Sequence, residues 1–176
     1  MTKQTKNLFH LENIAENTCI KCLWNTKNLT LAAVIAAIYV ALTLINPLSF
    51  GAVQFRVSEA LTLLPILLPQ SIPGLFVGVL ISNLFSPVGV LDIIFGSLAT
   101  LLAAIGTYKL RKKLVLATLS PVVVNGVIIG VLLYATGIVP ALLETMLSVA
   151  FGELVVVVVL GLPMIKAIDK VVNKIK

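Results

Sequence analysis

A polar stretch at residues 54–65 interrupts a strongly apolar sequence and carries groups that can bind a polar molecule. If the stretch is helical, Arg56 and Glu59 are three residues apart and share a face, with Thr62 one turn further along that face. An ionisable side chain in hydrocarbon costs about 2.5–3.5 kcal/mol on insertion scales, so such groups usually face a cavity or a partner. We therefore favour the wall of a ligand pocket over the alternative, a structural Arg56–Glu59 pair at the membrane surface.

Further polar residues are scattered through the apolar segments that follow: Asn83, Asp92, Asn125, Glu144 and Glu153. Asp92 and Glu144 can simply begin helices, where a carboxylate complements the helix dipole. Asn125 can bond across two helices and hold them together. Glu153 is harder to explain structurally, because it lies deep in an apolar segment. The alternative for Glu153 is a neutral buried acid bonded to a neighbour.

The composition indicates an integral membrane protein. Of the 176 residues, 59% are hydrophobic and only 11% are charged, whereas a soluble domain has about 25% charged residues. The length suits one compact bundle without a separate soluble domain. Residues 1–28 are a polar arm that lacks the apolar core and cleavage site of a signal peptide. The arm contains Cys19, Cys22 and the single histidine, which are too few ligands for a zinc site, so we predict no metal.

Six apolar segments predict an all-α bundle of six transmembrane helices in the cell membrane. They are residues 29–45, 54–68, 72–85, 90–108, 114–134 and 142–165. We expect residues 29–165 to form the membrane domain and residues 166–176 a basic cytoplasmic tail. The second segment is short, because 15 residues of α-helix cover about 22 Å of a hydrocarbon core about 30 Å thick. That segment is therefore a short span or sits partly inside the bundle.

The basic residues predict the orientation. Twelve of the 13 Lys and Arg residues lie in the arm, in the loop at 109–113 or in the tail, and Arg56 is the exception. Six spans place those three regions on one side, which the positive-inside rule makes cytoplasmic, so both termini face the cytoplasm. This clustering argues against nucleic-acid binding. The acidic and amide residues then lie in the outer half of the membrane or near its centre, which favours a shared pocket open to the outside.

No motif in the sequence indicates an enzyme. There is no nucleophile elbow, HExxH, Walker A loop or Ser/His/Asp set, so we predict no catalytic residues. If the protein moves its ligand uphill, the energy must come from an ion gradient or from a partner. Ala33, Ala37 and Ala41 recur every four residues in the first span, and such a smooth face lets another helix approach closely. That helix can belong to the same bundle or to a separate membrane subunit.

Two stretches together resemble the signature of the QueT family. They are residues 54–62, QFRVSEALT, and residues 86–101, SPVGVLDIIFGSLATL, and the intervening residues 72–78, IPGLFVG, fit as well. Ordinary apolar helices would not reproduce the polar positions of these stretches. The resemblance covers about residues 29–165 and leaves out the arm.

The resemblance implies a six-helix S component of an energy-coupling factor (ECF) transporter, which binds a queuosine precursor from the outside. The ligand would be a 7-deazaguanine such as preQ1, preQ0 or queuine. The partners would be a transmembrane T component and two ATPases that use ATP, and no cofactor is expected on this chain. In such systems a small-residue stripe on the first helix docks on the T component, which Ala33, Ala37 and Ala41 match. The loop at 46–53 would act as an outer gate.

The expected ligand matches the polar residues chemically. A guanine-like edge presents N1–H and an exocyclic amine as adjacent donors, which one carboxylate can accept together, and its carbonyl needs a donor such as Arg56. An aminomethyl group, as on preQ1, would require a second carboxylate. Phe55, Phe85 and Phe95 are the rings available for stacking. The candidate substrate-binding residues, with Glu59 ranked first, Glu153 second and Asp92 third among the carboxylates, are Gln54, Arg56, Glu59, Asn83, Asp92, Asn125 and Glu153.

Three other functions remain open from the sequence. The chain can be an S component for another vitamin, a stand-alone ion-coupled carrier that uses Glu153 as its proton site, or a membrane scaffold that uses the alanine face without transport. Co-purified subunits and a panel of ligands distinguish these functions.

Overall fold

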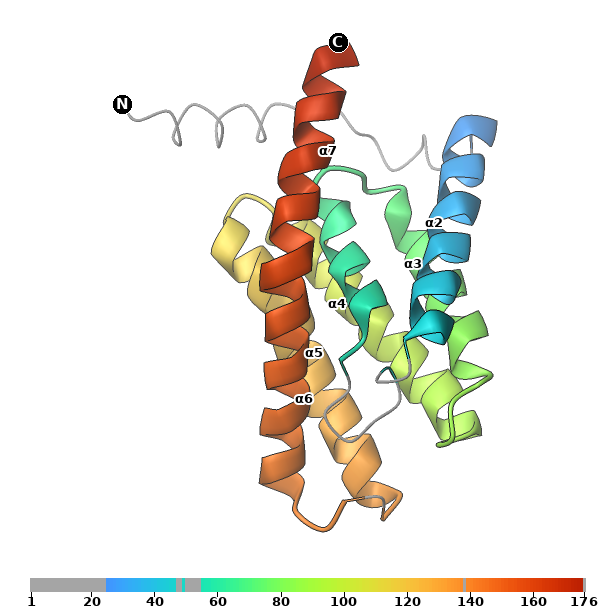
Figure 1. Ribbon diagram of the computed structural model, residues 1–176, viewed down its shortest axis with the longest axis vertical. Helices are drawn as coiled ribbons and strands as arrows, with labels where there is room; N and C mark the ends of the chain where they lie inside the picture. Colours follow the sequence, from blue (N-terminus) through green and yellow to red (C-terminus); the bar gives the residue numbers. More distant parts are fainter. Residues whose placement is uncertain (1–24, 47–48, 50–54, 138, 176) are drawn as a thin grey trace.

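The computed structural model describes residues 25–46, 49, 55–137 and 139–175, and no strand occurs among them. The elements, drawn in Figure 1, are α2 (Thr26–Ile45), η3 (Val57–Ile66), α3 (Ser71–Asn83), η4 (Asp92–Gly96), α4 (Ser97–Lys109), α5 (Leu114–Ala135), α6 (Leu142–Val156), η5 (Val157–Gly161) and α7 (Leu162–Ile175). The element η3 is a 3-10 helix, and η4 and η5 are π-helical turns. The predicted all-α class is confirmed.

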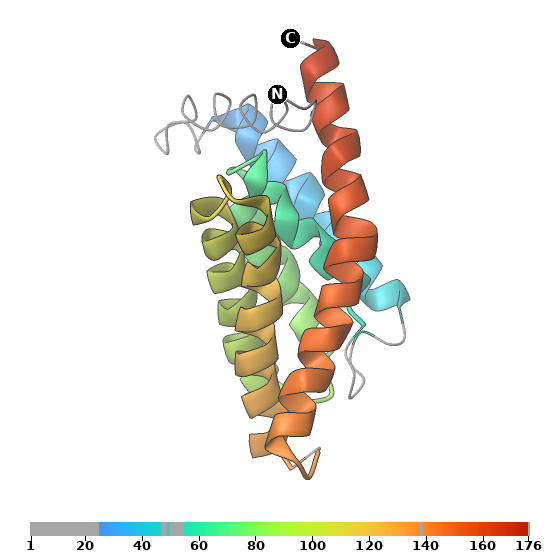
Figure 2. The same ribbon diagram turned by 90° about the vertical axis from the view of Figure 1, so that its left-hand side faces the viewer.

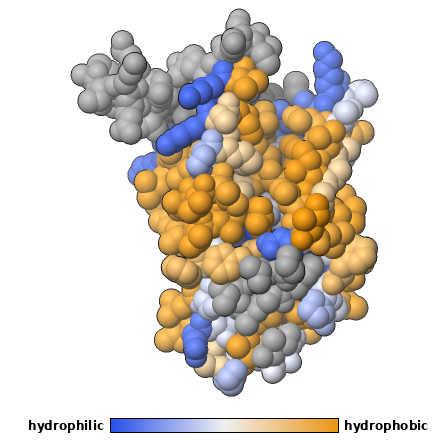
Figure 3. Space-filling model, viewed as in Figure 1, coloured by the Kyte–Doolittle hydropathy of each residue, from blue (hydrophilic) through white to orange (hydrophobic). Residues whose placement is uncertain are grey.

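Three helices are long and apolar enough to cross a membrane: Thr26–Ile45, Leu114–Ala135 and Leu142–Val171. The predicted spans at 54–68, 72–85 and 90–108 correspond to shorter elements, so the count of six spans and the orientation stay predictions. Figures 1 and 2 place the start of α2, the loop between α4 and α5, and the C-terminus at one end of the bundle. The described basic clusters lie at that end, and Figure 3 shows a broad apolar surface below it, as a membrane protein requires.

The element η3 is buried at the centre of the bundle. Its side chains from Ser58 to Ile66 are all buried, and it contacts α2, α3, α4, α5, α6, η5 and α7. A 3-10 helix rises about 2.0 Å per residue against 1.5 Å in an α-helix, so ten residues cover about 20 Å instead of about 15 Å. Pro65 lies inside the element and lacks the N–H that an α-helical ladder needs. The short predicted segment is thus placed inside the bundle, one of the two arrangements expected for it.

The helices α2 and α3 pack closely because glycines of α3 face the backbone of α2. A Cβ atom built on Gly74 would lie 2.4 Å from the carbonyl oxygen of Ala32. A Cβ atom on Gly78 would lie 2.9 Å from the Cβ of Tyr39. Ala32 and Tyr39 are accordingly buried. This contact fixes the face that α2 turns toward the core.

We expect Gly74→Ala to destabilise the protein by about 1–3 kcal/mol, because the added methyl group must push α2 and α3 apart. A thermal melt in one detergent measures the loss as a lower melting temperature. Val77→Ala is the matched control, because Val77 lies on the same helix and is 47% exposed. A melting temperature of Gly74→Ala equal to that of the parent would show that this close approach contributes nothing to stability.

The last helix continues past the predicted end of the sixth span. The elements α6, η5 and α7 follow one another without a break from Leu142 to Ile175, so residues 166–175 of the predicted basic tail continue the last helix. Ile165 is buried in the core and Ile168 packs against it, whereas Lys166 and Lys170 are exposed. Figure 1 shows this end of α7 rising above the rest of the bundle.

Candidate ligand-binding site

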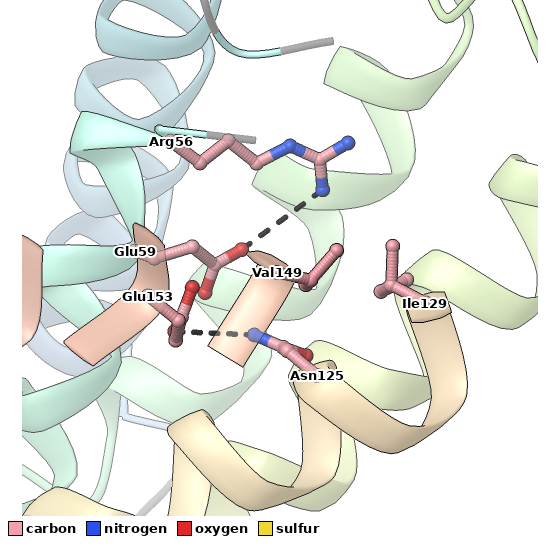
Figure 4. A pocket seen from close by; sticks show the side chains of 6 residues that line it. All are labelled: Arg56, Glu59, Asn125, Ile129, Val149 and Glu153. Atoms are coloured by element: carbon pink, nitrogen blue, oxygen red, sulfur yellow. Dashed lines mark hydrogen bonds and ion pairs between the residues drawn. The ribbon is translucent and has the colours of Figure 1, made fainter. Parts of the chain in front are cut away.

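A cavity lies where the start of η3 meets the middle of α5 and α6 (Figure 4). Its volume is about 220 Å³, counting space that is open to solvent. The lining residues are Arg56, Glu59, Asn125, Ile129, Val149 and Glu153.

Glu59 is held through one of its two carboxylate oxygens. The hydroxyl of Tyr39 donates a hydrogen bond to Oε1, and the hydroxyl of Thr100 donates to the same oxygen at 3.3 Å. Nη1 of Arg56 is 4.0 Å from that oxygen as well. The other oxygen, Oε2, is buried and has no hydrogen-bond partner in the described part of the chain. A buried unsatisfied polar atom costs about 1–3 kcal/mol, so Oε2 is a natural acceptor for a donor on a ligand.

Arg56 bridges two carboxylates from different elements. Its Nη1 faces Glu59, and its Nη2 lies 3.5 Å from Oδ2 of Asp92. The Arg56 side chain is only 4% exposed, so the Arg56–Glu59 pair lies inside the bundle and not on its surface. Because Arg56 also lines the cavity, its guanidinium group can orient Glu59 and donate to a ligand oxygen.

Asn125 and Glu153 form a second polar pair in the cavity, between α5 and α6. Nδ2 of Asn125 donates to Oε1 of Glu153 at 3.2 Å, so Asn125 does bond across helices. Its Oδ1 is nevertheless buried without a hydrogen-bond partner among the residues described. The two helices approach closely here because Gly126 faces Ala150, with a built Cβ only 2.9 Å from the Ala150 Cβ. This packing places an amide oxygen and a carboxylate side by side.

Asp92 lies outside the lining and supports Arg56. It belongs to the π-helical turn η4 and is 1% exposed. Its Oδ1 has no hydrogen-bond partner among the described residues, and its Oδ2 faces Arg56. Asn83 donates from Nδ2 to the backbone carbonyl of Asp92 at 2.9 Å. Such π-turns are frequent at functional sites, and this one is fixed beside the guanidinium group.

The structure thus brings four of the predicted residues into one cavity: Arg56, Glu59, Asn125 and Glu153. Asp92 and Asn83 are connected to them through Arg56 and the η4 backbone. Gln54 lies outside the described residues, as do residues 1–24 of the arm and most of the loop at 46–53. Glu144 is exposed in the first turn of α6, in agreement with its explanation as a helix start.

Some features of the site were not predicted. Tyr39 and Thr100 hold Glu59, and Ile129 and Val149 form the apolar wall. A role for Tyr39 could have been predicted from the sequence, because a tyrosine in an apolar span needs a hydrogen-bond partner for its hydroxyl. Two of the proposed stacking rings are wrong, since Phe85 and Phe95 are 61% and 46% exposed. Phe55 does not line the cavity either.

Two comparisons with known proteins agree with this structure. The family described as QueT transporter matches residues 29–170. The queuosine precursor transporter QueT of Lactococcus lactis subsp. cremoris (strain MG1363) is 38% identical over 79 residues, which are 43% of this chain and 46% of that relative. The chain therefore aligns with about half the length of this curated relative. No solved structure matches the chain significantly. Because the family match covers most of the sequence, this chain belongs to the QueT transporter family.

Proposed function

We propose that this protein is the S component of an ATP-driven ECF importer and binds a queuosine precursor from the outside. The ligand is a 7-deazaguanine such as preQ1, preQ0 or queuine. The observation that carries the proposal is the cavity in which unpartnered acceptors on Glu59 and Asn125 lie near the Arg56 guanidinium group. The family and the name of the Lactococcus relative support this ligand class.

The order of donors and acceptors in the cavity fits a guanine-like edge. Such an edge carries a carbonyl oxygen, an N1–H and an exocyclic amine in a row. Arg56 and Glu59 lie one turn apart on the same face of η3 and offer a donor followed by an acceptor. The carbonyl oxygen would accept from Arg56, and the two N–H groups would donate to Oε2 of Glu59. Ile129 and Val149 supply apolar contact for the ring.

The exposed face of α2 supports docking on a T component. Ala33, Ala37 and Ala41 are exposed, whereas Ala32 and Ala36 are buried against α3. Packing within the bundle therefore accounts for the buried pair but not for the stripe. A smooth small-residue face lets a helix of another subunit approach closely in the membrane. Two ATPases bound to that T component would supply the energy, and the bilayer surrounds both membrane subunits.

The proposal is tested by calorimetry on the detergent-purified protein with preQ1, preQ0, queuine, riboflavin and thiamine. We expect at least one 7-deazaguanine to bind and both vitamins to fail. Binding of a vitamin instead would identify an S component of different specificity. Co-purification from cells should recover a T component and two ATPases, and uptake should stop when they are deleted. Uptake that persists in their absence would identify a stand-alone carrier.

Tyr39→Phe should weaken binding of the 7-deazaguanine up to about tenfold. The substitution removes one hydrogen bond to Oε1 of Glu59, and a bond to a charged group is worth about 1.5–3 kcal/mol, part of which serves to orient the carboxylate. The matched control is Tyr134→Phe, since Tyr134 is 46% exposed on α5. Equal affinities of both variants and the parent would show that Tyr39 does not position Glu59.

A further inference from the structure

The cavity has two polar poles that differ in charge. At one pole, Arg56 lies within 4.0 Å of Glu59 and 3.5 Å of Asp92. At the other pole, Glu153 accepts a hydrogen bond from the neutral Asn125 amide. No cation within the described ranges lies in salt-bridge distance of Glu153. The single guanidinium group thus faces three carboxylates: it forms ion pairs with Glu59 and Asp92, and it also attracts Glu153.

Burying an ionised carboxylate at the position of Glu153 costs free energy unless a cation lies beside it. Glu153 is 3% exposed, and a buried charge is found paired or coordinated because its desolvation is so unfavourable. The amide of Asn125 satisfies one oxygen but brings no charge. Helix ends do not explain Glu153 either, since α6 continues without a break through η5 and α7 to Ile175. The cavity and its support therefore hold three carboxylates and one guanidinium group, and a positive group on the ligand would reduce this imbalance.

The atoms at this pole also match the hydrogen bonds of an ammonium group. An ammonium group has three donors and no acceptor. Glu153 offers carboxylate oxygens, and Oδ1 of Asn125 is a buried acceptor without a partner in the described chain. Both side chains line the cavity (Figure 4). A neutral substituent such as a nitrile has no hydrogen to donate and would face these acceptors unfavourably.

We propose that Glu153 and Asn125 bind an ammonium group of the ligand, so that the site selects cationic 7-deazaguanines over neutral ones of the same ring. This inference rests on the proposed function and specifies its ligand. The guanine-like edge occupies the Arg56–Glu59 pole, and the aminomethyl substituent at position 7 extends to Glu153.

The test compares two ligands that differ in charge but share a ring: 7-aminomethyl-7-deazaguanine and 7-cyano-7-deazaguanine. Calorimetry on the parent should show a preference of at least about tenfold for the aminomethyl ligand, as expected when a buried charge gains its partner. Glu153→Gln keeps the size of the side chain and removes its charge. This substitution should lower the affinity for the aminomethyl ligand at least about tenfold. The affinity for the cyano ligand should stay within about threefold of that of the parent.

Glu144→Gln is the matched control, because Glu144 is an exposed carboxylate on the same helix, and it should change neither affinity. Equal affinities of both ligands for the parent would overturn the inference, and so would an equal loss of both in Glu153→Gln. The parent comparison needs no variant, so it decides the matter even if Glu153→Gln does not fold. If neither of these ligands nor queuine binds the parent, the proposed function itself fails and the inference falls with it.

Discussion

Glu59→Gln is expected to lower the affinity for a 7-deazaguanine by several-fold to about a hundredfold. The hydroxyls of Tyr39 and Thr100 donate to Oε1 of Glu59, and the Arg56 guanidinium group lies 4.0 Å from the same oxygen. A glutamine can satisfy these donors only with its amide oxygen, so its NH2 group must occupy the place of Oε2. That group would then face the N–H donors of the ligand. A buried donor left unsatisfied costs about 1–3 kcal/mol, which corresponds to the expected loss in affinity.

The measurement is a titration of Glu59→Gln, Glu153→Gln and Asp92→Asn, each first checked for folding by a thermal melt. Glu59→Gln should lower the affinity for the aminomethyl and the cyano ligand alike, whereas Glu153→Gln should lower only the affinity for the aminomethyl ligand. Asp92→Asn should have the smallest effect, because Asp92 acts on the cavity through Arg56. If all three variants bind both ligands within twofold of the parent, the pocket lies elsewhere in the molecule.

Polar residues in apolar segments were the part of the site that the sequence could reveal. Burying an ionisable group in hydrocarbon is costly, so Arg56, Glu59 and Glu153 could be expected to face one another or a cavity. The ends of helices were also readable, because Pro, Gly and basic residues mark them. The predicted fifth segment at 114–134 differs from α5 by a single residue at its end.

The inward faces of the helices could not be predicted in the same way. Lipid is as apolar as the core of the bundle, so a membrane helix shows little contrast between its two sides. Tyr39 and Phe95 lie in similar apolar surroundings in the sequence, yet Tyr39 is fully buried and Phe95 is 46% exposed. The 3-10 form of η3 was equally hidden, because it arises from packing at the centre of the bundle and not from local propensity alone.

One face of α2 supports the ligand-binding site, and the opposite face is available for docking on a partner. One face packs against α3 through Ala32 and Ala36, close to Tyr39, which holds Glu59. The other face exposes Ala33 and Ala37. A leucine on the exposed face would hold a partner helix away without touching the cavity. Ala33→Leu or Ala37→Leu should therefore leave ligand affinity unchanged but weaken assembly with the T component and abolish uptake.

Three measurements on the same variants separate docking from binding. Calorimetry on the purified chain should give the affinity of the parent, co-purification should recover less T component, and uptake by whole cells should fall to background. Val131→Leu is the control, because Val131 is 45% exposed and lies on α5, away from the alanine stripe of α2. A bulky residue there replaces one branched side chain with another and should not disturb uptake. Normal uptake with Ala33→Leu and Ala37→Leu combined would show that no partner helix needs this face, and energy coupling would have to enter through another surface of the bundle.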